Sequence, residues 1–380
     1  MMNNSPLLSD NQENRRKVLK KIWKKSHLDF LLLVGVLILA TFGFGILYSA
    51  GNQSLALLQH QVLSFILAFA AMCLFAQIPT YRYQSLVPWV YSAVLLLLVA
   101  VISVGVINKG AQRWLNLGIL RFQPSEIMKL VVPMMLSWYL RNKNFPLHTK
   151  DLFVCCLIVA LPVLIIAKQP DLSTAILVAA TGAFVLLLAG ITWKLIIGIA
   201  AIIAVAIPIV WHYFMHAYQK ARLFTFLSPE HDPYGSGYNI IQSKIAIGSG
   251  GWFGKGWLLG SQAHLQFLPE HATDFIFAVC GEEFGFIGCI LLLGIFLYIV
   301  GRGLYLSVCA QDTFTRLLAG SLSISFFASF FINICMVVGI LPVVGLPLPL
   351  VSYGGSSLVI FMSGFGIIMS TRTHRKLIGA

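Results

Sequence analysis

The segment IGSGGWFGKGWLLGSQAHLQFLPEHATDFIF, residues 247–277, is the longest polar and glycine-rich interruption in a chain that is otherwise almost continuously apolar. Its glycines permit backbone paths that other residues avoid. The carboxylate of Asp274 follows them just where the next apolar run begins. This pattern predicts a shaped polar site that opens at the surface of a membrane.

The apolar runs on both sides of this segment predict a polytopic membrane protein. The chain of 380 residues is 58% hydrophobic and only 10% charged, far from the balance of a soluble domain. Runs of about 17 to 25 residues can cross a hydrocarbon core as helices, so we expect an all-α integral membrane protein with about ten transmembrane helices. The runs lie near residues 28–48, 57–78, 86–107, 125–140, 151–167, 172–190, 193–213, 274–300, 313–339 and 348–370.

The distribution of Lys and Arg predicts the orientation. These residues are concentrated in the N-terminal tail 1–27 and in the loops on the same side of the predicted bundle, which the positive-inside rule places in the cytoplasm. The ten-helix membrane domain is then 28–370, the C-terminal tail 371–380 is cytoplasmic, and the large loop 214–273 between helices 7 and 8 is external. The basic cluster 15–25 suits anionic membrane lipids, although a role in topology alone is the simpler interpretation. The net charge of +13 therefore reflects topology and not nucleic-acid binding.

A charged pair is predicted on the external side, in NKGAQRWLNLGILRFQPSEIMKL, residues 108–130. Pro124 suits the first position of a helix, so Glu126 falls in the first turn and Lys129 follows at i+3 on the same face. Ionisable residues inside a span normally face the bundle interior. The two side chains therefore form either a structural ion pair or part of a working site.

Other carboxylates lie near the starts of later helices. Asp171 follows Pro170 at the start of the run 172–190, where helix capping is the simpler interpretation and substrate contact is the alternative. Glu282 and Glu283 lie deeper in the run that begins at Asp274, and we expect them to be buried structural partners.

The glycines around Lys255 do not form a nucleotide-binding loop, because Gly256 stands where that motif needs Ser or Thr. Backbone amides together with Lys255 can still hold an anionic group. Alternatively, the glycines let Trp252 and Trp257 lie at the membrane interface. Just before them, residues 240–247 are expected to form a short amphipathic helix along the outer membrane surface.

The last external segment, LPVVGLPLPLVSYGGSS, residues 341–357, is rich in proline and glycine. Irregular backbone at membrane depth is tolerated only where it contacts protein or a water-filled cavity. We therefore expect this segment to face the same cavity as Asp274. Its residues Ser352, Tyr353 and Ser356 would line that cavity, as would Asp171.

Taken together, these motifs, with KQPDLSTA at 168–175 and the run 237–288, resemble the SEDS family of shape, elongation, division and sporulation proteins, and most of all its elongation branch. The resemblance covers nearly the whole chain. It departs at Ser173, where glycine is expected, and at Val344, where threonine is usual. The resemblance implies a ten-helix peptidoglycan glycosyltransferase that polymerises lipid II at the outer face of the cytoplasmic membrane, with a class B penicillin-binding protein as transpeptidase partner.

The resemblance also implies roles for single residues. Asp274 corresponds to the family's essential loop aspartate and would be the general base, and Glu126 would orient Lys129. A divalent cation, Mg or Mn, is compatible with the pyrophosphate, although the chain shows no metal-ligand spacing. The residues expected to bind substrate or pyrophosphate are Lys129, Glu126, Arg113, Trp114, Arg121 and Lys255.

Two other functions remain open at this point. A flippase or transporter of the lipid-linked precursor would also place charged residues inside a helical bundle, but it predicts functional polar groups on both sides of the membrane. A non-catalytic scaffold of the cell-wall machinery would not need the cluster of Asp274, Glu126 and Lys129.

Overall fold

The structure is a computed structural model. It describes residues 27–108, 111–116, 121–145, 147–190, 198, 205, 208, 210–214, 220, 237–264, 270–343 and 345–373. The predicted span 193–213, most of the N-terminal tail and the end of the C-terminal tail lie largely outside these residues.

The described chain is a multi-span helical membrane protein, as the apolar runs predicted. Within the described residues, 6 helices are long and apolar enough to cross a membrane. The α-helices are α2 (Phe30–Ala50), α3 (Leu55–Gln77), α4 (Thr80–Val104), α5 (Pro124–Leu140), α6 (Thr149–Lys168), α7 (Leu172–Leu188), α10 (Tyr238–Gly250), α11 (Ser261–His264), α12 (Ile276–Val308), α13 (Thr313–Val338) and α14 (Gly355–Thr373). A π-helical turn, η1, covers Val210–Phe214.

The long helices form two packed groups. Buried side chains of α4, α5, α6 and α7 form one apolar cluster, while those of α2, α3, α12, α13 and α14 form most of a second, larger one. Rings of Phe296, Phe326 and Phe330 contact one another in the centre of the larger cluster. Helix α13 joins the groups, because it packs against α5 and α7 on one side and against α12 and α14 on the other. A cavity where the groups meet is therefore lined by helices from both.

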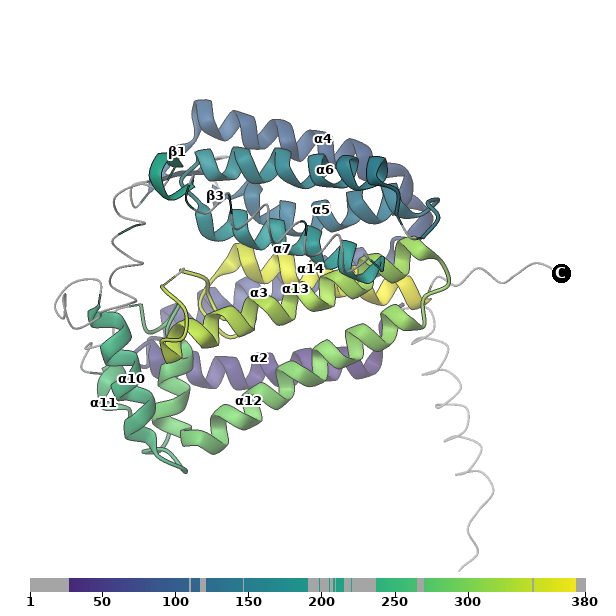
Figure 1. The fold of residues 1–380 in the computed structure, drawn as a ribbon. Coiled ribbons are helices and arrows are strands. Elements are labelled where there is room, and N and C mark those ends of the chain that lie inside the picture. Colours follow the sequence, from purple (N-terminus) through teal and green to yellow (C-terminus); the bar gives the residue numbers. More distant parts are fainter. Residues whose placement is uncertain are drawn as a thin grey trace, which may run out of the picture.

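The elements that the sequence predicts to be external gather at one end of the bundle. In Figure 1 the long helices run across the picture, and β1, β3, α10 and α11 all lie at its left end. Helix α10 crosses the direction of the long helices and contacts α12 and α13. The predicted helix at 240–247 is therefore present, and it extends further in both directions.

Within the described residues, a small antiparallel sheet departs from the all-helical expectation. It consists of β1 (Val106–Asn108), β2 (Ala111–Asn116) and β3 (Arg121–Phe122), in the order β1-β2-β3. Val106 pairs with Trp114 and Asn116 pairs with Arg121. Backbone groups need hydrogen-bond partners, and the ladder supplies them where the chain turns back from α4 into α5.

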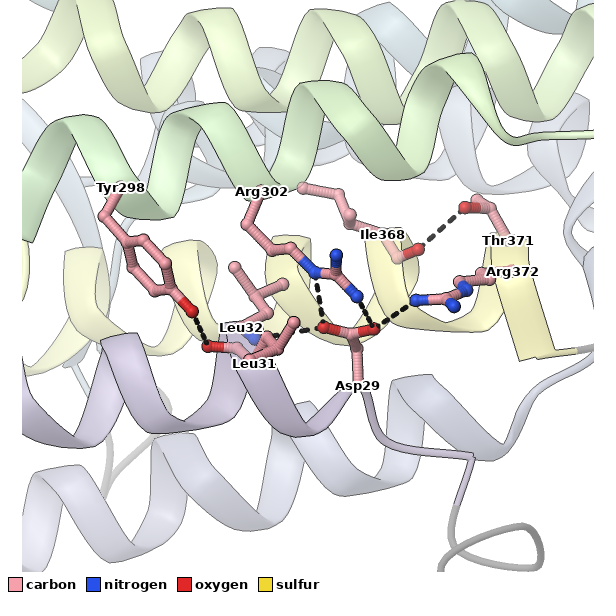
Figure 2. A network of polar contacts seen from close by, with 8 residues as sticks. All are labelled: Asp29, Leu31, Leu32, Tyr298, Arg302, Ile368, Thr371 and Arg372. Atoms are coloured by element: carbon pink, nitrogen blue, oxygen red, sulfur yellow. Dashed lines mark hydrogen bonds and ion pairs between the residues drawn. The ribbon is translucent and has the colours of Figure 1, made fainter.

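At the opposite end of the bundle, an ionic cluster ties three helices together (Figure 2). Asp29 caps the start of α2 by accepting from the backbone N–H of Leu32 at 3.0 Å. Its carboxylate also accepts from Arg302 Nε of α12 at 2.9 Å and from Arg372 Nη1 of α14 at 2.7 Å. Burial alone would raise the pKa of Asp29, but the hydrogen bond from Arg302, that from Leu32 and the two guanidinium charges hold this pKa below its usual range.

Candidate functional site

A polar cavity of about 290 Å³ lies at the end of the bundle that carries the small sheet, where the two groups of helices meet. Its wall comes from β2, α5, α7, α13, the segment before α14 and the first turns of α14. Five of the lining residues carry hydroxyl groups and three are charged. The lining residues are Trp114, Gln123, Glu126, Lys129, Asp171, Ser173, Thr174, Leu177, Ser329, Gly345, Leu346, Pro347, Gly354, Ser356, Ser357 and Phe361.

The predicted pair of Glu126 and Lys129 is present in the wall of this cavity. Helix α5 begins at Pro124, which places Glu126 in its first turn. Lys129 Nζ lies 2.6 Å from Glu126 Oε1, and each residue is only 8% exposed. Glu126 Oε2 is also buried and has no hydrogen-bond partner among the described residues. The pair is therefore an ion pair that retains an unused acceptor beside the cavity.

Asp171 caps α7, as the position after Pro170 predicted. Its Oδ1 accepts from the backbone N–H of Thr174 at 3.3 Å. Its Oδ2 accepts from Gln123 Nε2 at 2.8 Å, and the same amide donates to Ser125 Oγ at 2.9 Å. Because Asp171 also lines the cavity, the cap joins the start of α7 to the start of α5 at the site.

Asp274 lies in the turn before α12, beside a residue of the cavity wall. Its side chain is adjacent to Gly345, since a Cβ placed on this glycine would lie 3.6 Å from Asp274 Oδ2. Gly345 itself lines the cavity and has a φ of 74°, which favours glycine. The segment 341–357 therefore lines the cavity through Gly345 and brings this glycine next to Asp274.

Backbone-directed hydrogen bonds hold this turn against the segment before α14. Asn333 of α13, which is fully buried, donates through Nδ2 to the carbonyl of Asp274 at 2.8 Å and to that of Leu346 at 2.6 Å. Tyr353 N donates to the carbonyl of Ala272 at 2.9 Å, and Ser352 Oγ donates to the carbonyl of Thr273. Three hydrogen bonds thus join the carbonyls of residues 272–274 to α13 and to the segment before α14.

The other predicted site residues divide between the cavity and other places. Trp114 and Ser356 line the cavity, whereas Ser352 and Tyr353 hold the loop behind it. Lys255 lies elsewhere, where its Nζ is 2.6 Å from Glu282 Oε1. Arg113 and Arg121 are placed on β2 and β3, but their side chains lie outside the described residues, as does Val344. Their roles in binding pyrophosphate stay predictions.

Comparison with known proteins identifies the family. The family model described as "Cell cycle protein", which groups FtsW, RodA and SpoVE, matches residues 25–377. The chain belongs to the FtsW, RodA and SpoVE family. The resemblance to the SEDS family is therefore confirmed.

Three known proteins are similar to this FtsW/RodA/SpoVE member in sequence or structure. The peptidoglycan glycosyltransferase MrdB of Escherichia coli K12 is 48% identical over 360 residues, covering 94% of this chain and 97% of that protein. A probable peptidoglycan glycosyltransferase FtsW of Trichlorobacter lovleyi is 37% identical over 374 residues, covering 95% and 97%. A solved chain of a peptidoglycan synthase complex that coordinates polymerization and crosslinking superposes with a TM-score of 0.79 at 31% identity, covering 90% and 97%.

Sequence reasoning missed two residues of the site in this FtsW/RodA/SpoVE member. Asn333 is an amide inside the apolar run 313–339, and polar groups in such runs normally bond within the bundle. The sequence therefore indicated that Asn333 is buried in the bundle, but it did not indicate that Asn333 bonds to Asp274 and Leu346. Gln123 lies directly before Pro124, and nothing in the sequence pairs it with Asp171.

The cavity wall combines groups of both charges with hydroxyl groups. Lys129 supplies a cation and the start of α14 supplies a positive helix end, whereas Glu126 and Asp171, which caps α7, supply carboxylates. Ser173, Thr174 and Ser357 supply hydroxyl groups to the wall. Among the described residues, no group of three or more His, Cys, Asp or Glu side chains could hold a metal ion by itself.

Proposed function

We propose that this chain is a peptidoglycan glycosyltransferase that polymerises lipid II at the outer face of the cytoplasmic membrane during cell elongation. The observation that carries this proposal is the position of the Asp274 carboxylate next to Gly345, which lines a cavity whose wall also holds Lys129. A carboxylate and a cation thus lie at or beside one polar cavity, which supports the proposal. The 48% identity to MrdB, above the 37% to a division-type FtsW, supports the elongation role.

The reaction requires a base at the acceptor. A sugar hydroxyl of the acceptor must lose its proton as it attacks the anomeric carbon of the donor, and a positioned carboxylate performs this general-base step. Asp274 is that base in our proposal. Direct attack without a covalent intermediate inverts the α-linked sugar pyrophosphate to a β-linkage, so a nucleophilic carboxylate is not required.

The departing lipid pyrophosphate requires positive charge. Cations placed where negative charge develops lower the barrier, most strongly in a site that excludes water. Lys129 serves this purpose, and Glu126 orients it through the 2.6 Å ion pair. Arg113 and Arg121, on the strands next to the cavity, are the further cations we propose for the pyrophosphate.

The donor set also fits a divalent cation bound together with substrate. Mg²⁺ in phosphate sites is usually held by one or two carboxylates plus substrate oxygens. Glu126, with its unused Oε2, and Asp171 are the two carboxylates in the wall. When bound, Mg²⁺ or Mn²⁺ would add positive charge at the pyrophosphate.

The partner we propose is a class B penicillin-binding protein acting as transpeptidase. The solved chain with a TM-score of 0.79 belongs to a complex of polymerization and crosslinking, which supports such a pairing. The orientation we propose places both termini in the cytoplasm. Asp29, Arg302 and Arg372 lie at the end of the bundle opposite the cavity. The two arginines make that end basic, as the positive-inside rule requires of a cytoplasmic side, and this supports the orientation.

Glycan polymerisation from purified lipid II tests the proposal. The wild type, Asp274→Ala and the control Glu270→Gln should each be assayed with and without a partner transpeptidase whose active site is inactivated. Glu270 is an exposed carboxylate of the same turn. Polymer from the wild type and from Glu270→Gln, with none from Asp274→Ala, is the expected result.

Other outcomes would redirect the proposal. Equal polymer from Asp274→Ala would remove this carboxylate from the role of base. No polymer from any form, combined with translocation of lipid II across vesicles, would favour a flippase. Growth of cells that carry only the Asp274→Ala chain would favour a scaffold.

A further inference from the structure

Helix α12 is broken near its external end. Gly285 has φ 65° and ψ −162°, so the helix consists of a short external portion, 276–284, and a long portion, 286–308. A helix break leaves backbone carbonyls and N–H groups without their usual partners. In a membrane-spanning helix each such group costs several kcal/mol unless another partner is found.

The glycine-rich segment 250–257 supplies those partners. Lys255 N and Gly256 N donate to the carbonyls of Glu282 and Glu283, each at 3.0 Å. On the other side of the break, Phe286 N donates to the carbonyl of Gly251 at 2.9 Å and Ile287 N to that of Trp252 at 3.2 Å. The segment therefore bridges the two portions of α12.

Close backbone approach explains the glycines of this bridge. A Cβ on Gly254, whose φ is 79°, would lie 2.1 Å from the carbonyl oxygen of Glu283. A Cβ on Gly285 would lie 2.3 Å from the backbone nitrogen of Gly254. By contrast, a Cβ on Gly248 would have no atom within 4 Å.

Side chains reinforce the bridge. Glu282 is fully buried, and its Oε1 accepts from Lys255 Nζ at 2.6 Å and from Ser261 Oγ at 3.0 Å. On the facing side, Ser49 of α2 donates to Glu283 Oε1, and Trp257 Nε1 donates to the carbonyl of Gly45 of α2 at 3.0 Å. The external portion of α12 is thus held between α2 and the glycine-rich segment.

Asp274 lies immediately before this external portion, so its position depends on the direction in which the portion points. We infer that the glycine-rich segment, through its backbone bridge across Gly285 and the ion pair of Lys255 with Glu282, positions Asp274 beside the cavity. Lys255 and Glu282 are then positioning residues. This inference relies on the proposed function for the role of Asp274 as base, and it replaces pyrophosphate binding as the role of Lys255.

Kinetics separate positioning from pyrophosphate binding. The variants are Gly254→Ala, which displaces the bridge, and Lys255→Met and Glu282→Gln, which remove the ion pair. A misplacement of about 1 Å can cost about 100-fold in rate, so we expect kcat to fall roughly 10- to 100-fold. KM for lipid II should stay within about twofold, because ground-state binding is retained. Lys255→Arg should recover most of kcat, and Gly248→Ala should match the wild type.

Hydrogen exchange measured by mass spectrometry tests the bridge without any activity. Gly254→Ala should speed exchange in residues 274–287 relative to the wild type, whereas Gly248→Ala should not. If Gly254→Ala does not fold, Lys255→Met and Glu282→Gln replace it in both measurements. Unchanged exchange, or faster exchange with wild-type kcat, would overturn the inference.

Two further outcomes are distinguishable. A rise in KM for Lys255→Met alone, with Glu282→Gln and Gly254→Ala unaffected, would return Lys255 to pyrophosphate binding. If the wild type makes no polymer with its partner present, the proposed function fails. The exchange of residues 274–287 then still decides whether the segment holds the turn at Asp274.

Discussion

At the scale of single residues, the pair of Glu126 and Lys129 can have a structural role, a catalytic role or both. A buried ion pair is weak evidence for function by itself, because removing one partner destabilises a protein whatever its role. The unused Glu126 Oε2 and the position of both residues in the cavity wall point to a role beyond packing. Single substitutions do not separate a structural role of the pair from a catalytic one, but a double-mutant cycle does.

We predict that Lys129→Met lowers both stability and activity. It leaves a buried carboxylate without its cation, which costs on the order of 3 to 5 kcal/mol. It also removes the positive charge that stabilises the departing pyrophosphate, and this loss should lower kcat about 100- to 1000-fold. The double variant Glu126→Gln/Lys129→Met should recover most of the melting temperature but none of the activity. Recovery of both would reduce the pair to a structural role.

At the scale of elements, the site depends on contacts among the turn before α12, helix α13 and the segment before α14. Asn333 forms the central contact, since one amide donates to backbone carbonyls of the two other elements. Both carbonyls belong to irregular segments, which have no regular ladder to supply donors. Their arrangement therefore depends on this side chain.

We predict that Asn333→Leu lowers kcat at least about tenfold, because the turn carrying Asp274 is released from α13. The two carbonyls left without donors should also lower stability by about 1 to 3 kcal/mol each. Ser325→Ala, on the same helix, is the matched control, since the Ser325 hydroxyl has no hydrogen-bond partner among the described residues. Glycan synthesis and melting temperature provide the readouts. Wild-type kcat in Asn333→Leu would show that other contacts position Asp274.

At the scale of the whole molecule, the two ends of the bundle serve different purposes. One end carries the cavity, the small sheet and the break in helix α12, where irregular backbone is stabilised by specific contacts. The opposite end is closed by the cluster of Asp29, Arg302 and Arg372, which joins α2, α12 and α14 (Figure 2). Because α2 and α12 also hold the glycine-rich segment, this cluster fixes the helices against which the site is built.

We predict that Asp29→Ala lowers the melting temperature and destabilises the protein by about 3 kcal/mol. Asp312→Ala, at an exposed carboxylate of the same end that accepts hydrogen bonds from Gln84 and Thr315, should cost less, about 1 kcal/mol. The folded pKa of Asp29 lies below its usual 3.8, so its contribution is complete at neutral pH and is lost only as pH falls below 3.8. The difference between wild type and Asp29→Asn should therefore be equal at pH 7 and pH 5. A difference that disappears by pH 5 would contradict this assignment.

The sequence by itself determined the features that depend on local spacing. Apolar runs of the right length specified the membrane-spanning helices. The i+3 spacing after Pro124 specified the pair of Glu126 and Lys129, and the position of Asp171 specified a helix cap. The burial of Glu282 and Glu283 was also predicted, because carboxylates inside an apolar run need interior partners.

Only the tertiary structure decided which distant groups meet. The amide of Asn333 reaches Asp274, Gln123 reaches Asp171, and Lys255 is bonded to Glu282 and not placed at the cavity. The sheet and the break at Gly285 were also missed. Each of these features depends on hydrogen bonds between segments that are separated along the chain or turn back on themselves. Hydropathy and helical periodicity do not record such partners, since a polar group has the same sequence signature whichever donor or acceptor it finally contacts.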